Sequence, residues 1–354
     1  MSAGLTASWH ASTSALIAAA LTCAACARPA SVPPLPPLGP NAPIELAVPG
    51  ATALRPSVAT QPPLVAVAFG TRDTRGALVY LATSVDNGAT FSPPRPATDY
   101  AAGAAEYDDI RLTFVDVEAG DAGRPRLRLE WQDRNGLTAS RLLAPWARRP
   151  IEPASRPTQR RASAIASCES DGEVRLVAGQ AGADPVSVNH GLTDQACRSR
   201  DAAAVLDARQ WVHAVWSGGQ PGGHRLFYAA SSDRRWFGGA QTIDSGGQPA
   251  HVQVTTDPND TVVAVWDHEV DGQRQVSLRQ VLPAHHGPAT LLPVTRLSDQ
   301  RGGERAVVAG INGGVIAAWQ VPAAGIVVIR RVGLDAICET TPPTTGDTVP
   351  AAAR

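Results

Sequence analysis

The chain repeats one sequence pattern six times, and this repeat constrains the fold more than any other feature. Six short apolar runs lie 38 to 62 residues apart, and five of them end in Phe or Trp: 64–69, 126–131, 173–178, 212–216, 262–266 and 315–319. Each follows another short run across a turn rich in Gly, Asp, Asn or Pro; these preceding runs are 55–59, 109–112, 161–165, 200–205, 251–254 and 305–308. Short, turn-bounded runs rich in β-branched residues predict antiparallel strands.

The size of the repeat selects among all-β architectures. Residues 44–335 divide into six repeats of about 49 residues, close to the length of a four-stranded propeller blade. We therefore predict an all-β, six-bladed β-propeller over residues 44–337, in which neighbouring blades bury each other's faces. The run 44–48 is a candidate fourth strand of the last blade, closing the ring from the N-terminus. A pair of long β-sandwiches is the alternative.

Composition is consistent with a packed domain and argues against several classes of partner. Hydrophobic residues make up 44% of the 354 residues, and the formal net charge is −1, with Arg at every basic position. This charge balance gives no electrostatic footprint for nucleic acid. No apolar run reaches the ~20 residues of a membrane-spanning helix, which excludes a multi-span membrane protein. Cys and His residues show no metal-ligand spacing, so we expect no metal and no cofactor.

The N-terminus has the form of an export signal. A short apolar run is followed by small residues, and two of these precede Cys26, as they do at the lipidated Cys of a bacterial lipoprotein. Cys23 fits that position less well. We predict a signal over 1–26 with lipidation at Cys26, an ordinary cleaved signal being the alternative, and then a stiff Pro-rich linker over 27–43. The last residues, 338–354, predict a disordered tail.

Three cysteines lie in the body of the chain. An exported protein can form disulfides, and a bond between Cys168 and Cys197 would close a loop of about 30 residues and stabilise by roughly 3 kcal/mol. Cys338 would remain unpaired. The alternative is that all three are buried thiols.

One short motif points to a family. Residues 84–91 fit the pattern S-x-D-x-G-x-T-F through Ser84, Asp86, Gly88, Thr90 and Phe91. The carboxylate can accept backbone N–H groups within a turn, the glycine can adopt a positive φ, and the ring can pack beside the hairpin. This segment resembles the Asp box of sialidase-like, BNR-repeat propellers, and a degenerate second copy keeps Asp233 and Trp236. The Asp box is structural in that family, so the resemblance implies a fold rather than an activity.

The resemblance also implies where a ligand site would lie. Sialidases bind the sugar carboxylate with three Arg residues, whose planar guanidinium groups make bidentate contacts. Candidates at or near strand starts are Arg55, Arg72, Arg161, Arg200 and Arg305, and the alternative is that they are solvated rim groups. Asp73, Asp108 and Asp109 are weak candidates for acid/base groups and fit turn positions better.

The family's nucleophile has no counterpart. It is a Tyr paired with a Glu late in the chain, whereas the last Tyr here is Tyr228, before a degenerate Asp box. We therefore expect a monomeric, lipid-anchored, non-catalytic propeller of the cell envelope that binds a glycan or an envelope protein. The alternatives are a divergent glycoside hydrolase of the sialidase-like superfamily, and a scaffold subunit of an envelope complex.

Overall fold

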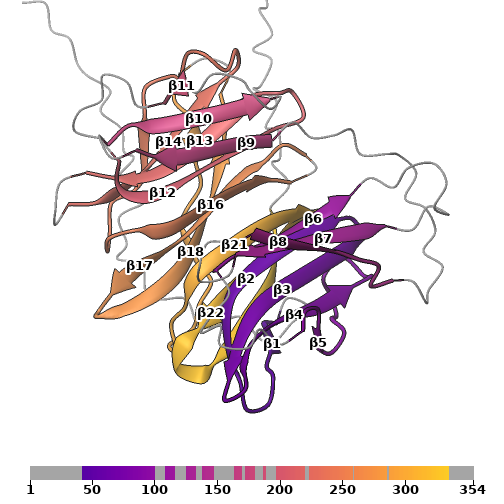
Figure 1. Cartoon of the computed structure of the whole chain (residues 1–354). Helices are drawn as coiled ribbons and strands as arrows, with labels where there is room; N and C mark the ends of the chain where they lie inside the picture. The colour runs from indigo at the N-terminus through magenta and orange to yellow at the C-terminus, as the bar shows by residue number, and fades with distance from the viewer. Residues whose placement is uncertain are drawn as a thin grey trace, which may run out of the picture. The chain divides into compact units, whose positions relative to one another are not determined.

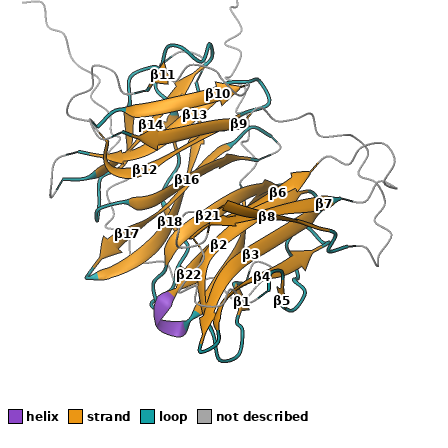
Figure 2. Cartoon of the chain, viewed as in Figure 1, coloured by secondary structure: helices purple, strands orange, loops and turns teal. Residues whose placement is uncertain are grey.

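The computed structural model shows an all-β protein. It describes residues 42–99, 108–115, 125–132, 138–146, 163–169, 172–179, 186–188, 197–219, 223–257, 259–284 and 287–334. Within these ranges every regular element is a strand except the short 3₁₀ turn Pro322–Ala324 (Figure 2). The strands join in antiparallel pairs, as the alternating runs and turns of the sequence predict.

The described strands form six sheets, named I to VI here (Figure 1). Sheet I holds β2 (Thr52–Gln61), β3 (Leu64–Asp73), β4 (Gly76–Ser84) and β5 (Arg95–Pro96). Sheet II holds β6 (Asp108–Val115), β7 (Arg126–Gln132) and β8 (Thr138–Leu143), and sheet III holds β9 (Ser163–Cys168), β10 (Val174–Gly179) and β11 (Val186–Ser187). Sheet IV holds β12 (Cys197–Leu206), β13 (Val212–Gly218), β14 (Arg225–Ser231) and β15 (Gln241–Asp244).

The last two sheets complete the described fold. Sheet V holds β16 (Ala250–Thr256), β17 (Val262–Val270), β18 (Gln273–Leu282), β19 (Thr290–Leu291) and β20 (Thr295–Arg296). Sheet VI holds β21 (Glu304–Ile311), β22 (Gly314–Val321), β23 (Ile326–Gly333) and, as its outer strand, β1 (Ile44–Leu46). Ile44 pairs with Ile329, so a segment from the start of the chain completes a sheet built from its end.

The second strands of sheets I, IV and VI are buried on both faces. Every residue of β13 and β22 is buried, as are the first eight residues of β3. A strand covered on one face alone would alternate apolar and polar residues, whereas a strand covered on both is continuously apolar. This burial explains the runs that first mark the repeat in the sequence, such as 262–266.

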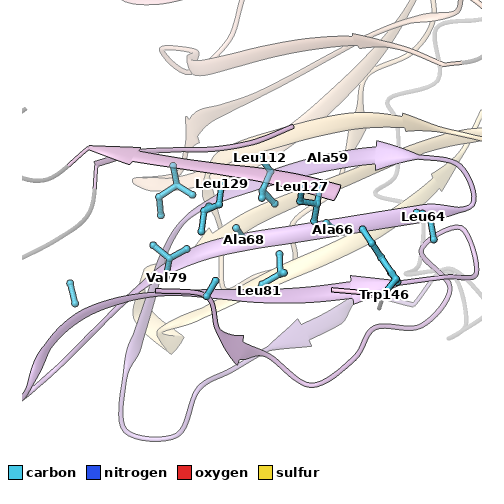
Figure 3. Packing of buried hydrophobic residues seen from close by; sticks show 13 residues of the cluster. Ala59, Leu64, Ala66, Ala68, Val79, Leu81, Leu112, Leu127, Leu129 and Trp146 are labelled. Atoms are coloured by element: carbon cyan, nitrogen blue, oxygen red, sulfur yellow. The ribbon is translucent and has the colours of Figure 1, made fainter. Parts of the chain in front are cut away.

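Five clusters of buried side chains form the core, and each fills the space between two neighbouring sheets. They join sheets I and II, I and VI, V and VI, IV and V, and III and IV. Figure 3 shows the first cluster, in which Ala66 and Val79 of sheet I face Leu127 and Leu129 of sheet II. Flat faces of apolar side chains therefore hold the sheets together in the order II, I, VI, V, IV, III.

The first strands of the sheets follow the same order. β2 contacts β6 and β21, while β16 contacts β21 and β12, and β12 in turn contacts β9 (Figure 1). The N-terminal ends of these strands therefore form a row across neighbouring sheets, and that row positions the candidate site.

Candidate functional site

Four first strands carry the same backbone irregularity near their N-terminal ends. In β2, Leu54 pairs with Gly70 and Ser57 with Ala68, so two residues face one, which is a β-bulge. Equivalent bulges interrupt β6, β16 and β21. The first bulge residue has a left-handed backbone in each: Arg55 (φ 48°), Asp109 (φ 48°), His251 (φ 50°) and Arg305 (φ 54°).

This conformation is unfavourable for these residue types. A left-handed residue with a Cβ costs about 1 kcal/mol or more relative to the right-handed form, and such residues cluster at functional sites. The second bulge residue turns inward and is buried, as with Ile110, Val252 and Ala306. The first keeps part of its surface accessible to solvent. The bulge therefore presents one polar side chain per sheet at the same level, and we call Arg55, Asp109, His251 and Arg305 the bulge row.

An aromatic residue of the second strand lies opposite each bulge, and in sheets V and VI the side chain of the residue that follows it contacts the next sheet. After Trp266, Asp267 accepts the backbone N–H of Arg305 at 2.8 Å. After Trp319, Gln320 accepts the backbone N–H of Arg55 through Oε1 at 2.8 Å. Each left-handed backbone in the bulge row at sheets VI and I is thus held by a side chain of the preceding sheet.

Asp267 is the centre of the most connected part of the row. Its side chain is fully buried, and His251 Nδ1 lies 2.7 Å from Oδ2, the same oxygen that accepts the Arg305 N–H. Arg274 Nε donates to Oδ1, and Arg274 Nη2 donates to the Asp267 carbonyl at 3.0 Å. Because an ionised carboxylate only accepts, His251 donates through Nδ1, which leaves Nε2 of a ring that is 30% exposed facing away from Asp267.

Arg305 is held through its backbone, and its side chain is less engaged. Its backbone is fixed by Asp267, its side chain is half-buried, and no hydrogen bond or ion pair of its guanidinium occurs among the described residues. On the neighbouring strand, Gln320 Nε2 donates to Glu304 Oε1 at 2.6 Å, which orients the amide oxygen that holds Arg55. Arg55 and Arg305 therefore occupy equivalent positions on adjacent first strands.

The other predicted Arg residues are placed less favourably or lie outside the described part. Arg72 is exposed on β3, where it pairs with Thr52. The position of Arg161 lies outside the described residues, and for Arg200 only the backbone, in β12, is described. The structure therefore brings together two of the five predicted Arg residues.

The predicted carboxylates are held by local Arg residues where their side chains are described. Asp73 accepts the Arg75 N–H at 2.7 Å and pairs with its guanidinium at 2.9 Å, in the turn after β3. Asp109 belongs to the bulge row and pairs with Arg111 at 2.6 Å. The side chain of Asp108 lies outside the described part.

Sequence reasoning missed His251, Asp267 and Arg274. A signal was present, because Asp267 directly follows a buried apolar run that ends in Trp, where a carboxylate requires partners. His251 opens a first strand at the position that Arg55 and Arg305 occupy in theirs.

A second His–carboxylate contact joins sheets IV and V. His268 Nδ1 lies 3.2 Å from Asp244 Oδ2, and His268 Nε2 lies 3.1 Å from Ser277 Oγ. This is the order of groups in a hydrolase triad, but Ser277 is only 2% exposed, which shields its hydroxyl from a substrate. Burial raises the pKa of Asp244, and hydrogen bonds from His268, Gly246 and Trp266 outweigh burial and lower it. The contact ties two sheets together.

The segment predicted as an Asp box forms a tight turn after β4. Asp86 accepts hydrogen bonds from the Ser84 hydroxyl at 2.7 Å and from the Thr90 N–H at 2.9 Å. Gly88 has φ 81°, which residues with a Cβ rarely adopt, and a Cβ there would lie 2.4 Å from Ile316 Cδ1 of sheet VI, so this position favours glycine. Phe91 packs against the cluster between sheets I and VI.

The degenerate copy keeps the turn but not the ring packing. Asp233 accepts the Ser231 hydroxyl at 3.0 Å and the Trp236 N–H at 2.8 Å. The Trp236 side chain is 81% exposed, and Phe237 packs against the cluster between sheets III and IV instead. The carboxylate-centred turn is thus the feature that both copies share.

Of the cysteines, Cys168 is described and is disulfide-bonded. The side chain of Cys197 lies outside the described part, although its backbone belongs to β12, which contacts the strand of Cys168. The predicted lipidation site, Cys26, also lies outside the described residues.

Comparison with known proteins gives structural similarity without a family. No family model matches the chain, and no curated protein matches it. Similar solved structures include the NanB sialidase from Streptococcus pneumoniae, at 9% identity and a TM-score of 0.46 over 82% of this chain and 70% of that chain. An endo-arabinase from Bacteroides thetaiotaomicron is 10% identical, with a TM-score of 0.37 over 82% and 98%. A thermostable family-43 glycoside hydrolase is 12% identical, with a TM-score of 0.36 over 70% and 95%. At these values the similarities assign neither a family nor an activity.

In the described part of the chain, no helix is long and apolar enough to cross a bilayer.

Proposed function

We propose that the chain is a six-bladed, sialidase-like propeller that binds a carboxylate-bearing glycan at the bulge row without cleaving it. Each of the six sheets is one blade, and the outer strand β1 closes the last blade. Five inter-sheet clusters support this arrangement, since propeller blades are held by face-to-face apolar packing. The sixth blade contact, between sheets II and III, completes the ring in this proposal.

The observation that carries the function is the pair of interactions at Asp267 Oδ2. One oxygen fixes both the His251 ring, at 2.7 Å, and the Arg305 backbone, at 2.8 Å. The Arg305 backbone and the His251 imidazole are therefore held by one carboxylate oxygen at the N-terminal ends of adjacent first strands, and the half-buried Arg305 side chain extends from this fixed point. Arg is suited to a carboxylate because its planar fork makes two parallel hydrogen bonds, and Arg55 at the next position of the row adds a second cation.

The same contacts favour binding over hydrolysis. Glycoside hydrolysis ordinarily needs two carboxyl groups that flank the bond. Asp267 is fully buried and engaged by three partners, and Asp73 and Asp109 are each paired with an Arg two residues away. Among the described side chains, these carboxylates are committed to holding the protein's own cations.

Attachment to a membrane completes the proposal. A signal over 1–26 would export the chain, lipidation of Cys26 would anchor it, and the Pro-rich segment 27–43 would hold the propeller away from the bilayer.

The test is an array of sialylated, uronate-containing and neutral glycans probed with the purified chain. We expect the binding of carboxylated glycans to be at least tenfold weaker for Arg305→Ala, and any binding of neutral glycans to be unchanged by it. The backbone bond to Asp267 survives that change, since it uses the N–H. Arg235→Ala, at an exposed position in another turn, is the matched control and should bind as the parent does. Binding of neutral glycans alone, or no loss in Arg305→Ala, would overturn the proposal.

A further inference from the structure

A cavity with a mixed polar and apolar lining lies at the opposite ends of the strands from the bulge row. It occupies about 140 Å³ between the β12–β13 turn of sheet IV and the β16–β17 turn of sheet V. Its walls include Asp207, Arg209, Trp211, Asn259, Asp260 and Thr261. His251 and Thr256 lie near the two ends of β16 (Ala250–Thr256), so the cavity and the row are separated by roughly 17 Å along the strand.

The two turns that form the cavity are built alike. Asp207 Oδ1 accepts the Trp211 N–H at 2.7 Å, and Asp257 Oδ1 accepts the Thr261 N–H at 2.8 Å. A direct bond then joins the turns, because the Ala208 N–H donates to Asp260 Oδ1 at 2.8 Å. The walls are therefore preorganised, which lowers the entropy lost when a ligand binds.

A buried polar chain leads to the cavity from inside sheet IV. His213 is fully buried, with Nδ1 2.9 Å from the Tyr228 hydroxyl and Nε2 3.4 Å from Asp207 Oδ2. In sheets V and VI the equivalent position, three residues before the strand's Trp, is apolar: Val263 and Ile316. A buried His in such a place costs free energy that an apolar residue would not, and its polar chain ends at the cavity wall.

The hydrogen bonds of this buried polar chain favour the charged form of Asp207, which acts as a hydrogen-bond acceptor. Burial raises the pKa of Asp207, but hydrogen bonds from His213 and the Trp211 N–H outweigh burial and lower it. Burial also raises the pKa of Tyr228. Asp207 is 7% exposed, and its Oδ2 lies 3.4 Å from His213 Nε2.

We propose that this cavity is a second ligand site, for a neutral saccharide unit. The half-buried Trp211 supplies an aromatic surface, while Asp207, Asp260 and Asn259 supply acceptors for hydroxyl groups and Arg209 supplies donors, the mixture expected for a small polar ligand. Two carboxylates against one guanidinium disfavour an anionic sugar. The cavity thus carries an excess of negative charge, whereas the bulge row presents Arg side chains. The proposal for the cavity does not depend on the function proposed for the row.

The test uses saturation-transfer NMR with the full chain and a panel of neutral probes: the methyl glycosides of glucose, galactose, mannose and N-acetylglucosamine. We expect transfer to at least one probe, and affinity at least tenfold weaker in Trp211→Ala. Trp236→Ala, which removes the 81% exposed Trp of the same sheet, should bind as the parent does, and so should Arg305→Ala.

Because Trp211 is half-buried, a second variant protects the test from a folding defect. Arg209→Glu alters an exposed wall residue and should also weaken binding tenfold while the melting temperature stays within a few degrees of the parent's. No transfer to any probe in the parent chain would overturn the site, as would full affinity in folded Trp211→Ala and Arg209→Glu. Loss of binding in Arg305→Ala would move the neutral sugar to the bulge row instead.

Discussion

The Asp267 carboxylate accepts the backbone N–H of Arg305 at 2.8 Å, across the boundary between sheets V and VI. The same oxygen lies 2.7 Å from Nδ1 of His251. One buried group thus holds two left-handed residues of neighbouring strands at a fixed spacing. The stability of the inter-sheet boundary and the geometry of the bulge row both depend on it.

Replacing Asp267 should therefore destabilise the fold strongly. Asp267→Ala leaves Arg274 and His251 without their carboxylate and the Arg305 N–H without an acceptor. We expect the free energy of unfolding to fall by about 3 kcal/mol. This is the lower end of the range for breaking a buried ion pair, because Arg274 and His251 are partly exposed. Urea denaturation measures the loss. Glu269→Ala, an exposed carboxylate on the same strand, should change stability by less than about 0.5 kcal/mol. A similar small change in both variants would contradict this role.

The turn at Asp86 predicts a pH-dependent contribution to stability. Burial alone would raise the pKa of Asp86. Hydrogen bonds from Thr90 and Ser84 outweigh burial, so the pKa is lowered overall. Since the folded-state pKa lies below the unfolded value of about 3.9, the stabilisation is present above that value and is lost as pH falls through the folded pKa. Asp86→Asn should cost about 1 kcal/mol or less at pH 7, because the carboxylate is exposed.

The difference between parent and Asp86→Asn should then shrink as pH falls below 4, measured by urea denaturation at pH 7 and pH 3. Asp271→Asn, in an exposed turn, is the control and should show no such trend. An equal difference in the free energy of unfolding between the parent and Asp86→Asn at both pH values would show that the stability of the turn does not depend on the charge of Asp86.

The strands were predictable because both the apolar runs and the turns are local signals. Every predicted run overlaps a described strand; for example, 212–216 lies in β13 and 315–319 in β22. The pairing of β1 with β23 also follows from counting strands per repeat. The bulges were not predictable, since Arg55 and His251 adopt a left-handed backbone that no local residue preference signals. Their partners lie in other sheets, and a sequence pattern alone does not show such a contact.

A disulfide between Cys168 and Cys197 remains a prediction with a clear test. The free energy of unfolding should fall by the same amount, about 3 kcal/mol, in each single Cys→Ser variant and in the double variant, because any one change opens the loop. Cys338→Ser should leave stability unchanged. Peptide mapping by mass spectrometry without reduction identifies the bond directly. A peptide linking Cys168 to Cys338 would contradict the pairing.

Lipidation at Cys26 is tested by expression in a bacterium that processes lipoproteins, with an alkyne-labelled fatty acid in the medium. We expect label on the parent chain and on Cys23→Ser, and none on Cys26→Ser, because only Cys26 directly follows two small residues. Label on Cys26→Ser but not on Cys23→Ser would move the anchor to Cys23. No label on the parent would favour an ordinary cleaved signal.

The central claim is that Arg305 binds a ligand carboxylate, and calorimetric titration tests it most directly. The best carboxylated glycan from the array would be compared with its carboxyl-methyl ester, on the parent chain and on Arg305→Ala. We predict that esterification and Arg305→Ala each weaken binding at least tenfold, and that the two together weaken it little more than either alone, since both remove one interaction. Equal affinity of the acid and its ester for the parent chain would contradict the account.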